Sequence, residues 1–129
     1  MKTIIFGIFL ILHGLVYFLY MGQSLRKFEL HPGMVWPDGS WAFSKLISKT
    51  SIRIIAATIC IISATSFIIG GADLILSEVI WKYPTTVAAT LATLMHMLLW
   101  DGKMKRLMDK GILGVIINIS ILGYICFSN

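Results

Sequence analysis

Four long apolar segments fill most of the chain, and each is free of Asp, Glu, Lys and Arg. They cover residues 4–23, 54–72, 83–100 and 111–129. Each holds about 18–20 residues, enough for a helix to cross the roughly 30 Å of hydrocarbon in a bilayer. The pattern predicts an all-α membrane protein. We expect an antiparallel bundle of four transmembrane helices, with spans at about 3–24, 52–75, 82–100 and 111–128.

Composition favours the same fold class. Hydrophobic residues make up 57% of the chain and charged residues 13%, and the mean hydropathy is +0.86. A soluble domain of this size needs a polar exterior, and this chain has too few charges to form one. Almost every residue falls within or beside a span. The sequence therefore predicts a single integral membrane domain, 1–129, with no soluble module.

The basic residues are concentrated in two of the three connections. Nine of the eleven lie between the first and second spans or between the third and fourth, and the other two are Lys2 and Lys82. Because short loops rich in Lys and Arg stay cytoplasmic, loops 24–53 and 101–110 are expected inside and both termini outside. The net charge of +5 then reflects membrane topology, so the lipid bilayer is the expected partner and nucleic acid is not.

The first connection contains two prolines and two glycines within residues 30–39, so it must turn there. Ser40 is then placed to cap an amphipathic helix over about 40–50, lying in the plane of the lipid headgroups. Aromatic and basic residues near the span ends are expected at the membrane interface. These residues are Trp36, Trp41, Trp81, Trp100, Lys45 and Lys49.

Polar residues inside the spans are the candidates for a ligand site, because burying each of them in lipid costs free energy. His13 and Tyr17 lie on one stripe of the first span. His96 and Asn118 lie on the small-residue faces of the third and fourth spans, where they can hydrogen-bond to each other across the hairpin. Two interpretations stay open: these four residues bind a ligand, or they only join helices through hydrogen bonds.

No catalytic residues, metal ligands or cofactor are predicted. Met95 and Met97 flank His96, a combination that suits Cu(I), but neighbours on a helix point about 100° apart and cannot share one face. No hydrolase or phosphate-loop motif occurs. Cys60 and Cys126 fall at different depths of their spans and are not expected to pair. Whether the chain is an enzyme stays open, with a non-catalytic role favoured.

Three short motifs resemble those of a known group. They are His13-Gly14, the run Trp36-Pro37-Asp38-Gly39-Ser40-Trp41, and Leu98-Leu99-Trp100-Asp101-Gly102-Lys103. In span order they resemble small four-span bacterial and archaeal membrane proteins of the DoxX-like group. The resemblance implies a four-helix bundle. For some members it also implies association with quinone-linked sulfur oxidation beside a partner subunit.

The leading functional hypothesis is a non-catalytic membrane protein that binds or translocates a small or lipophilic molecule between its helices. Its site would be lined by His13, Tyr17, His96 and Asn118. One alternative is an accessory subunit that scaffolds a membrane complex such as a quinone-linked oxidoreductase. Another is a channel whose pore is built by oligomerisation. The expected protein partner is accordingly a second copy of the chain or another membrane subunit.

Overall fold

The computed structural model describes residues 1–128 as four α-helices and one short 3-10 helix. They are α1 (Lys2–Ser24), α2 (Lys49–Leu76), α3 (Lys82–Leu98), η1 (Leu107–Lys110) and α4 (Ile112–Phe127). The predicted all-α fold of four antiparallel helices is confirmed. The first and last residues of each predicted span lie within three residues of the first and last residues of the corresponding helix. Residue 129, the last of the predicted domain, lies outside the described residues.

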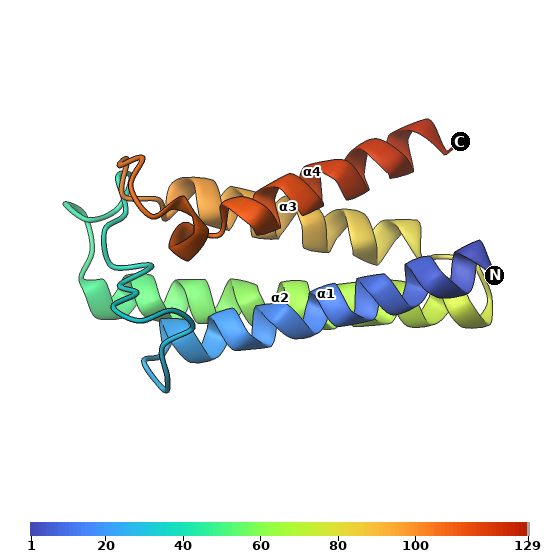
Figure 1. Cartoon of the computed structure of the whole chain (residues 1–129), viewed down its shortest axis with the longest axis horizontal. Coiled ribbons are helices and arrows are strands. Elements are labelled where there is room, and N and C mark those ends of the chain that lie inside the picture. The colour runs from blue at the N-terminus through green and yellow to red at the C-terminus, as the bar shows by residue number, and fades with distance from the viewer. Residues whose placement is uncertain (129) are drawn as a thin grey trace.

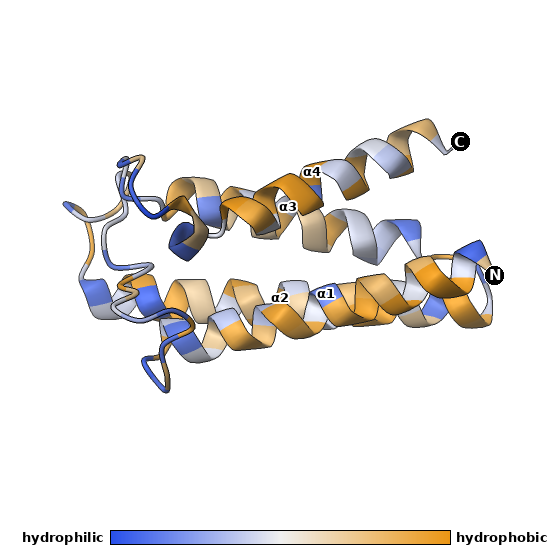
Figure 2. Ribbon diagram, in the orientation of Figure 1, coloured by the Kyte–Doolittle hydropathy of each residue, from blue (hydrophilic) through white to orange (hydrophobic). Residues whose placement is uncertain are grey.

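The helices form two hairpins, α1 with α2 and α3 with α4, joined by packing of α2 against α3. Both termini and the short α2–α3 connection lie at one end of the molecule (Figure 1). The two longer connections, 25–48 and 99–111, lie together at the other end. Hydropathy follows this division, since the helices are mostly hydrophobic and the hydrophilic residues gather in the connections (Figure 2).

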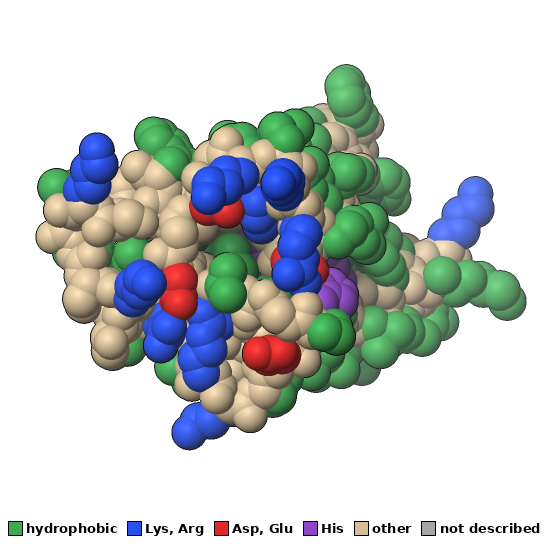
Figure 3. Space-filling model, turned by 60° about the vertical axis from the view of Figure 1, so that its left-hand side comes forward, with side chains coloured by type: hydrophobic (Ala, Val, Ile, Leu, Met, Phe, Trp, Pro, Cys, Tyr) green, Lys and Arg blue, Asp and Glu red, His purple; other side chains and the backbone are tan. Residues whose placement is uncertain are grey.

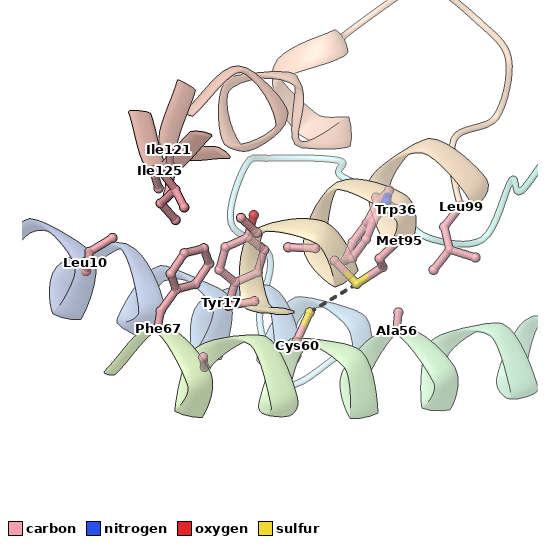
Figure 4. Packing of buried hydrophobic residues seen from close by; sticks show 14 of the residues in the cluster. Leu10, Tyr17, Trp36, Ala56, Cys60, Phe67, Met95, Leu99, Ile121 and Ile125 are labelled. Atoms are coloured by element: carbon pink, nitrogen blue, oxygen red, sulfur yellow. Dashed lines mark hydrogen bonds between the residues drawn. The ribbon is translucent and has the colours of Figure 1, made fainter. Parts of the chain in front are cut away.

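Small residues let α1 and α2 approach closely. A Cβ added at Gly71 would lie 2.5 Å from the backbone oxygen of Gly7, and one at Gly14 would lie 2.9 Å from the oxygen of Ala64. Such small-residue contacts are typical of helices that associate through close packing in lipid. Figure 4 shows the core beside this contact, where Tyr17 and Phe67 lie together and the Cys60 thiol reaches the Met95 sulfur, 3.6 Å away.

Two helices are long and apolar enough to cross a membrane, α1 and α2. Neither is enclosed by the rest of the protein, because only 28% and 39% of their most apolar windows are buried. α4 is apolar but shorter. The exposed large side chains of α1 are Ile4, Ile5, Ile8, Phe9, Leu12, Leu15, Val16 and Leu19.

The predicted amphipathic helix over 40–50 is wrong. Residues 41–46 form turns, and α2 begins at Lys49 behind the cap residue Ser48. Ser40 does accept a hydrogen bond from the Phe43 backbone, at 3.1 Å, as a cap residue would. The segment instead forms local turns and bonds to the chain just beyond α3, where the Trp41 backbone N–H donates to the Trp100 oxygen at 2.7 Å.

Two side chains of the same segment also bind the C-terminal end of α3. The Ser40 hydroxyl donates to the Leu98 oxygen at 2.6 Å, and the Trp41 indole donates to the Met97 oxygen at 2.7 Å. The last carbonyls of a helix have no partner within the helix. Connection 25–48 therefore supplies the donors that α3 lacks and ties one hairpin to the other.

We predict that Gly71→Ala destabilises the protein by about 1–3 kcal/mol, because the new methyl group would press on the Gly7 backbone and force α1 and α2 apart. The free energy of unfolding in detergent micelles measures this. Gly123→Ala is the matched control, since nothing lies within 4 Å of the Cβ it would add. Equal effects of the two substitutions would contradict a close α1–α2 contact.

Candidate functional site

A buried chain of polar side chains bridges α1 and α4, whose backbones make almost no direct contact. His13 Nε2 donates to Asn118 Oδ1 at 2.8 Å. Asn118 Nδ2 donates to the Tyr17 hydroxyl oxygen, also at 2.8 Å. The amide oxygen can only accept, so the proton of the neutral His13 ring lies on Nε2. This chain fixes the position of α4 against α1.

His96 lies next to this chain but outside it. Its side chain is only 2% exposed, and it occupies the space that glycines leave on α4. A Cβ added at Gly111 would lie 2.3 Å from the ring, and one at Gly114 would lie 3.7 Å from Nε2. The Lys110 backbone lies nearby, yet neither ring nitrogen completes a hydrogen bond with any residue among 1–128.

The structure therefore brings together all four residues that the sequence proposed for a ligand site. The Tyr17 and His96 ring centroids are 5.9 Å apart, and Gly114 lies beside both. The hydrogen bond considered between His96 and Asn118 is not formed, because Asn118 bonds to His13 and Tyr17 instead. The ligand-binding role of the four stays a prediction.

An apolar groove of about 240 Å³ runs along the outside of this cluster, between the end of α3 and the start of α4. His96 forms part of its wall, so the buried imidazole is the main polar group along an otherwise hydrophobic surface. Lys110 lies at one side of it. The lining residues are His96, Met97, Trp100, Met104, Leu107, Lys110, Ile112 and Val115.

A second pocket, of about 160 Å³, lies between connections 25–48 and 99–111. Lys103, Lys105, Arg106 and Lys110 line it from one connection, and Trp36 lines it from the other. We call it the basic pocket. The sequence interpretation missed it, although both the Lys/Arg cluster and the Trp36–Trp41 run had been recognised separately. Nothing in either run shows that the two meet.

Ion pairs shape the connections around the basic pocket. Asp38 accepts from Arg53 at 2.7 and 2.6 Å and pairs with Arg26 at 2.9 Å. Burial alone would raise the pKa of Asp38, but the hydrogen bonds from Arg53 and Arg26 outweigh it and lower the pKa. At Asp101 the effect of burial is likewise outweighed, chiefly by the hydrogen bond from Lys110, so its pKa is also lowered. Both carboxylates are therefore ionised at neutral pH.

The residues expected at the membrane interface have different environments. Trp36 and Trp81 are buried against other parts of the protein, whereas Trp41 is exposed and Trp100 is half-buried. Lys45 and Lys49 are exposed at the end that carries the long connections. Trp36 is thus part of the interior, and its ring centroid lies 5.3 Å from that of His96.

Within the described part of the chain, no three His, Cys, Asp or Glu side chains gather where they could hold a metal ion. Cys60 and Cys126 are both free thiols, the first buried and the second exposed. Comparisons of the sequence with known protein families and curated proteins, and of the fold with solved structures, find no match.

We predict that Asn118→Leu lowers the free energy of unfolding by about 1–3 kcal/mol, because His13 and Tyr17 each lose their partner while the side-chain volume is nearly kept. Unfolding in mixed detergent micelles is the measurement. Ser120→Ala is the control on the same helix, since Ser120 is exposed and bonds only to the Ile116 carbonyl. A loss no larger than that of the control would show that the bridge adds no stability.

Proposed function

We propose that the chain is a polytopic membrane protein in which all four α-helices cross the bilayer. The support is the apolar surface of α1 and α2, most of which no other part of the protein covers. A core helix of a soluble protein would be mostly enclosed, whereas a membrane helix meets lipid along its outer face. Close contact through Gly7, Gly14 and Gly71 suits the same environment.

The arrangement of charge supports an orientation with the long connections in the cytoplasm and both termini outside. Connections 25–48 and 99–111 carry seven of the eleven basic residues, and Lys49 and Arg53 lie in the adjoining first turns of α2. Figure 3 shows Lys and Arg side chains spread over this end of the surface. By the positive-inside rule, the short basic loops are retained in the cytoplasm.

Labelling of single cysteines tests this topology. In a Cys126→Ser background, where the remaining Cys60 is buried, we expect Ser128→Cys to react with a membrane-impermeant maleimide in intact cells. Ser44→Cys is expected to react only after the membrane is permeabilised, because exposed Ser44 belongs to connection 25–48. Labelling of Ser44→Cys in intact cells would contradict the orientation, and recovery of the protein in the soluble fraction would contradict membrane insertion.

We further propose that the protein binds or translocates a lipophilic molecule in the apolar groove between α3 and α4. The observation that carries this proposal is the unpartnered imidazole of His96 in the groove wall. A buried polar group without a hydrogen bond costs roughly 1–3 kcal/mol. A ligand with an apolar body and one hydrogen-bonding group would offset that cost and cover the hydrophobic lining at the same time.

His13, Tyr17 and Asn118 then support the site from behind. Their hydrogen bonds join one another, so they hold α4 at the distance from α1 that leaves room for His96. A direct contact with the ligand would require Asn118 to exchange one of these bonds. In this proposal His96 meets the ligand and the other three position the helix that forms the second wall of the groove.

We predict that Val115→Trp reduces the amount of co-purifying lipophilic molecule at least about tenfold, because the indole would fill the groove. A loss of about 1.4 kcal/mol of binding free energy is enough for a tenfold change. The measurement is mass spectrometry of organic extracts from protein purified in mild detergent, expressed per mole of protein. Leu113→Trp is the control, since Leu113 is exposed on the same turn of α4 and does not line the groove.

Equal amounts of extracted molecule from both tryptophan variants would contradict binding in the groove. Purification of the wild-type chain with a stoichiometric membrane subunit and an empty groove would favour the accessory-subunit alternative instead. Thermal unfolding of both variants confirms that each is folded before the extracts are compared.

A further inference from the structure

The apolar groove and the basic pocket are neighbours that share Lys110. The Lys110 ammonium pairs with Asp101 at 2.8 Å and donates to the Lys103 oxygen, also at 2.8 Å. Lys110 therefore stands between a hydrophobic hollow on one side and a charged one on the other. A ligand that occupied both would need an apolar part and a polar part joined at about this position.

The charges of the basic pocket do not cancel. Arg106 pairs with Asp109 at 2.6 Å, and Lys110 pairs with Asp101. Lys103 and Lys105 line the same pocket and make no ion pair within residues 1–128. Four basic residues thus face two carboxylates, Asp101 and Asp109, and the lining keeps an excess of two positive charges. A phosphate monoester carries about −1.5 to −2 charges at neutral pH and would balance them.

One residue that lines the basic pocket also carries a hydrogen-bond donor without a partner among residues 1–128. Trp36 is one of its lining residues and is only 4% exposed. Its indole Nε1 is buried and has no hydrogen-bond partner in the described structure. Like the imidazole of His96 in the groove, this buried donor is paired by no protein group. Ionised phosphate oxygens accept hydrogen bonds and do not donate them, so they suit an N–H donor as well as the two lysines.

We propose that the ligand is an anionic lipid, with a phosphate headgroup in the basic pocket and its hydrocarbon chain in the apolar groove. This inference rests on the proposed function and names the class of molecule. Lys103 and Lys105 supply the balancing charge, and the Trp36 indole donates to a phosphate oxygen. Lys110 lies where headgroup and chain join.

A free phosphate ion has the same headgroup chemistry but leaves the groove uncovered. The combination of a phosphate-sized, positively charged pocket with an adjoining hydrophobic groove is what favours a lipid. A zwitterionic lipid fits less well, because its own cation would face the unpaired lysines. The cytoplasmic position proposed for these connections also places the pocket at headgroup depth, where phosphates are abundant.

The test measures binding to the purified full chain in detergent micelles by native mass spectrometry. The probes are dioleoylphosphatidic acid, dioleoylphosphatidylcholine and inorganic phosphate. The first variant pair is Lys103→Gln/Lys105→Gln, with Lys45→Gln/Lys49→Gln as a control of equal charge change at exposed positions of the same end. The second pair is Val115→Trp with Leu113→Trp.

We expect one molecule of phosphatidic acid to bind each chain, more tightly than phosphatidylcholine. Lys103→Gln/Lys105→Gln should weaken the binding of phosphatidic acid about ten- to thirtyfold, because each lysine near an anionic headgroup raises the affinity by about three- to fivefold. The Lys45→Gln/Lys49→Gln control should change the affinity for phosphatidic acid by no more than about twofold, as expected for exposed lysines outside the pocket. Val115→Trp should also weaken the binding of phosphatidic acid, and Leu113→Trp should not.

Three results would overturn the anionic-lipid inference. Equal losses in the two lysine variants would show general attraction to a basic surface. Displacement of phosphatidic acid by inorganic phosphate, together with no effect of Val115→Trp on lipid binding, would show a soluble-anion site. A third result is unchanged lipid binding in Lys103→Gln/Lys105→Gln while Val115→Trp still loses the co-purifying molecule. It would show that the ligand has no anionic headgroup in the basic pocket, and the proposed function would still stand. If Val115→Trp loses no co-purifying molecule, both proposals fail.

Discussion

The hydrogen bonds between connection 25–48 and the C-terminal end of α3 are the constraint on which the rest of the molecule depends. Two carbonyls of that helix end, and the Trp100 carbonyl just beyond it, accept from Ser40 and Trp41. Such carbonyls have no partner within their own helix and need donors from elsewhere. Because the donors belong to the other hairpin, the same bonds hold the two hairpins in register. Both the apolar groove and the basic pocket lie beside this joint, and their shapes follow from it.

The two buried histidines show how similar residues come to differ in role. His13 has a partner in Asn118, and the bond between them joins two helices. His96 enters the space above Gly111 beside the Lys110 backbone, and neither ring nitrogen forms a hydrogen bond of good geometry within residues 1–128. The hydrogen bond of His13 accounts for its burial, because it stabilises the contact between the helices. Burial of the His96 ring costs free energy that no such bond within residues 1–128 offsets. This difference, rather than mere presence in a span, is what directs the functional interpretation to His96.

The helices could be predicted from sequence because each coincides with a long apolar run that is nearly free of charge, and that pattern is local. The polar cluster followed from helical spacing, since His96 shares a face with Ala89 and Ala92, all of them buried. The prediction for segment 40–50 was wrong because its apolar face suited a helix, while the structure closes it into local turns and ties Ser40 and Trp41 to residues 97–100, far away in sequence. The basic pocket was missed for the same reason. Its walls come from Trp36 and from residues after Asp101, and no periodicity reports their meeting.

Helix length explains why the groove lies where it does. α3 and α4 have 17 and 16 residues, or about 26 and 24 Å at 1.5 Å per residue, slightly less than the roughly 30 Å of a hydrocarbon core. α2 has 28 residues and exceeds that thickness. If all four helices cross the bilayer as proposed, the chain between α3 and α4 turns near the hydrocarbon boundary, where Gly111 precedes α4 in a left-handed conformation with φ of 83°. Two helices that end early leave an apolar hollow below the turn, and the turn itself carries the lysines. In the proposed membrane setting, that boundary is also where the chain and headgroup of a lipid separate.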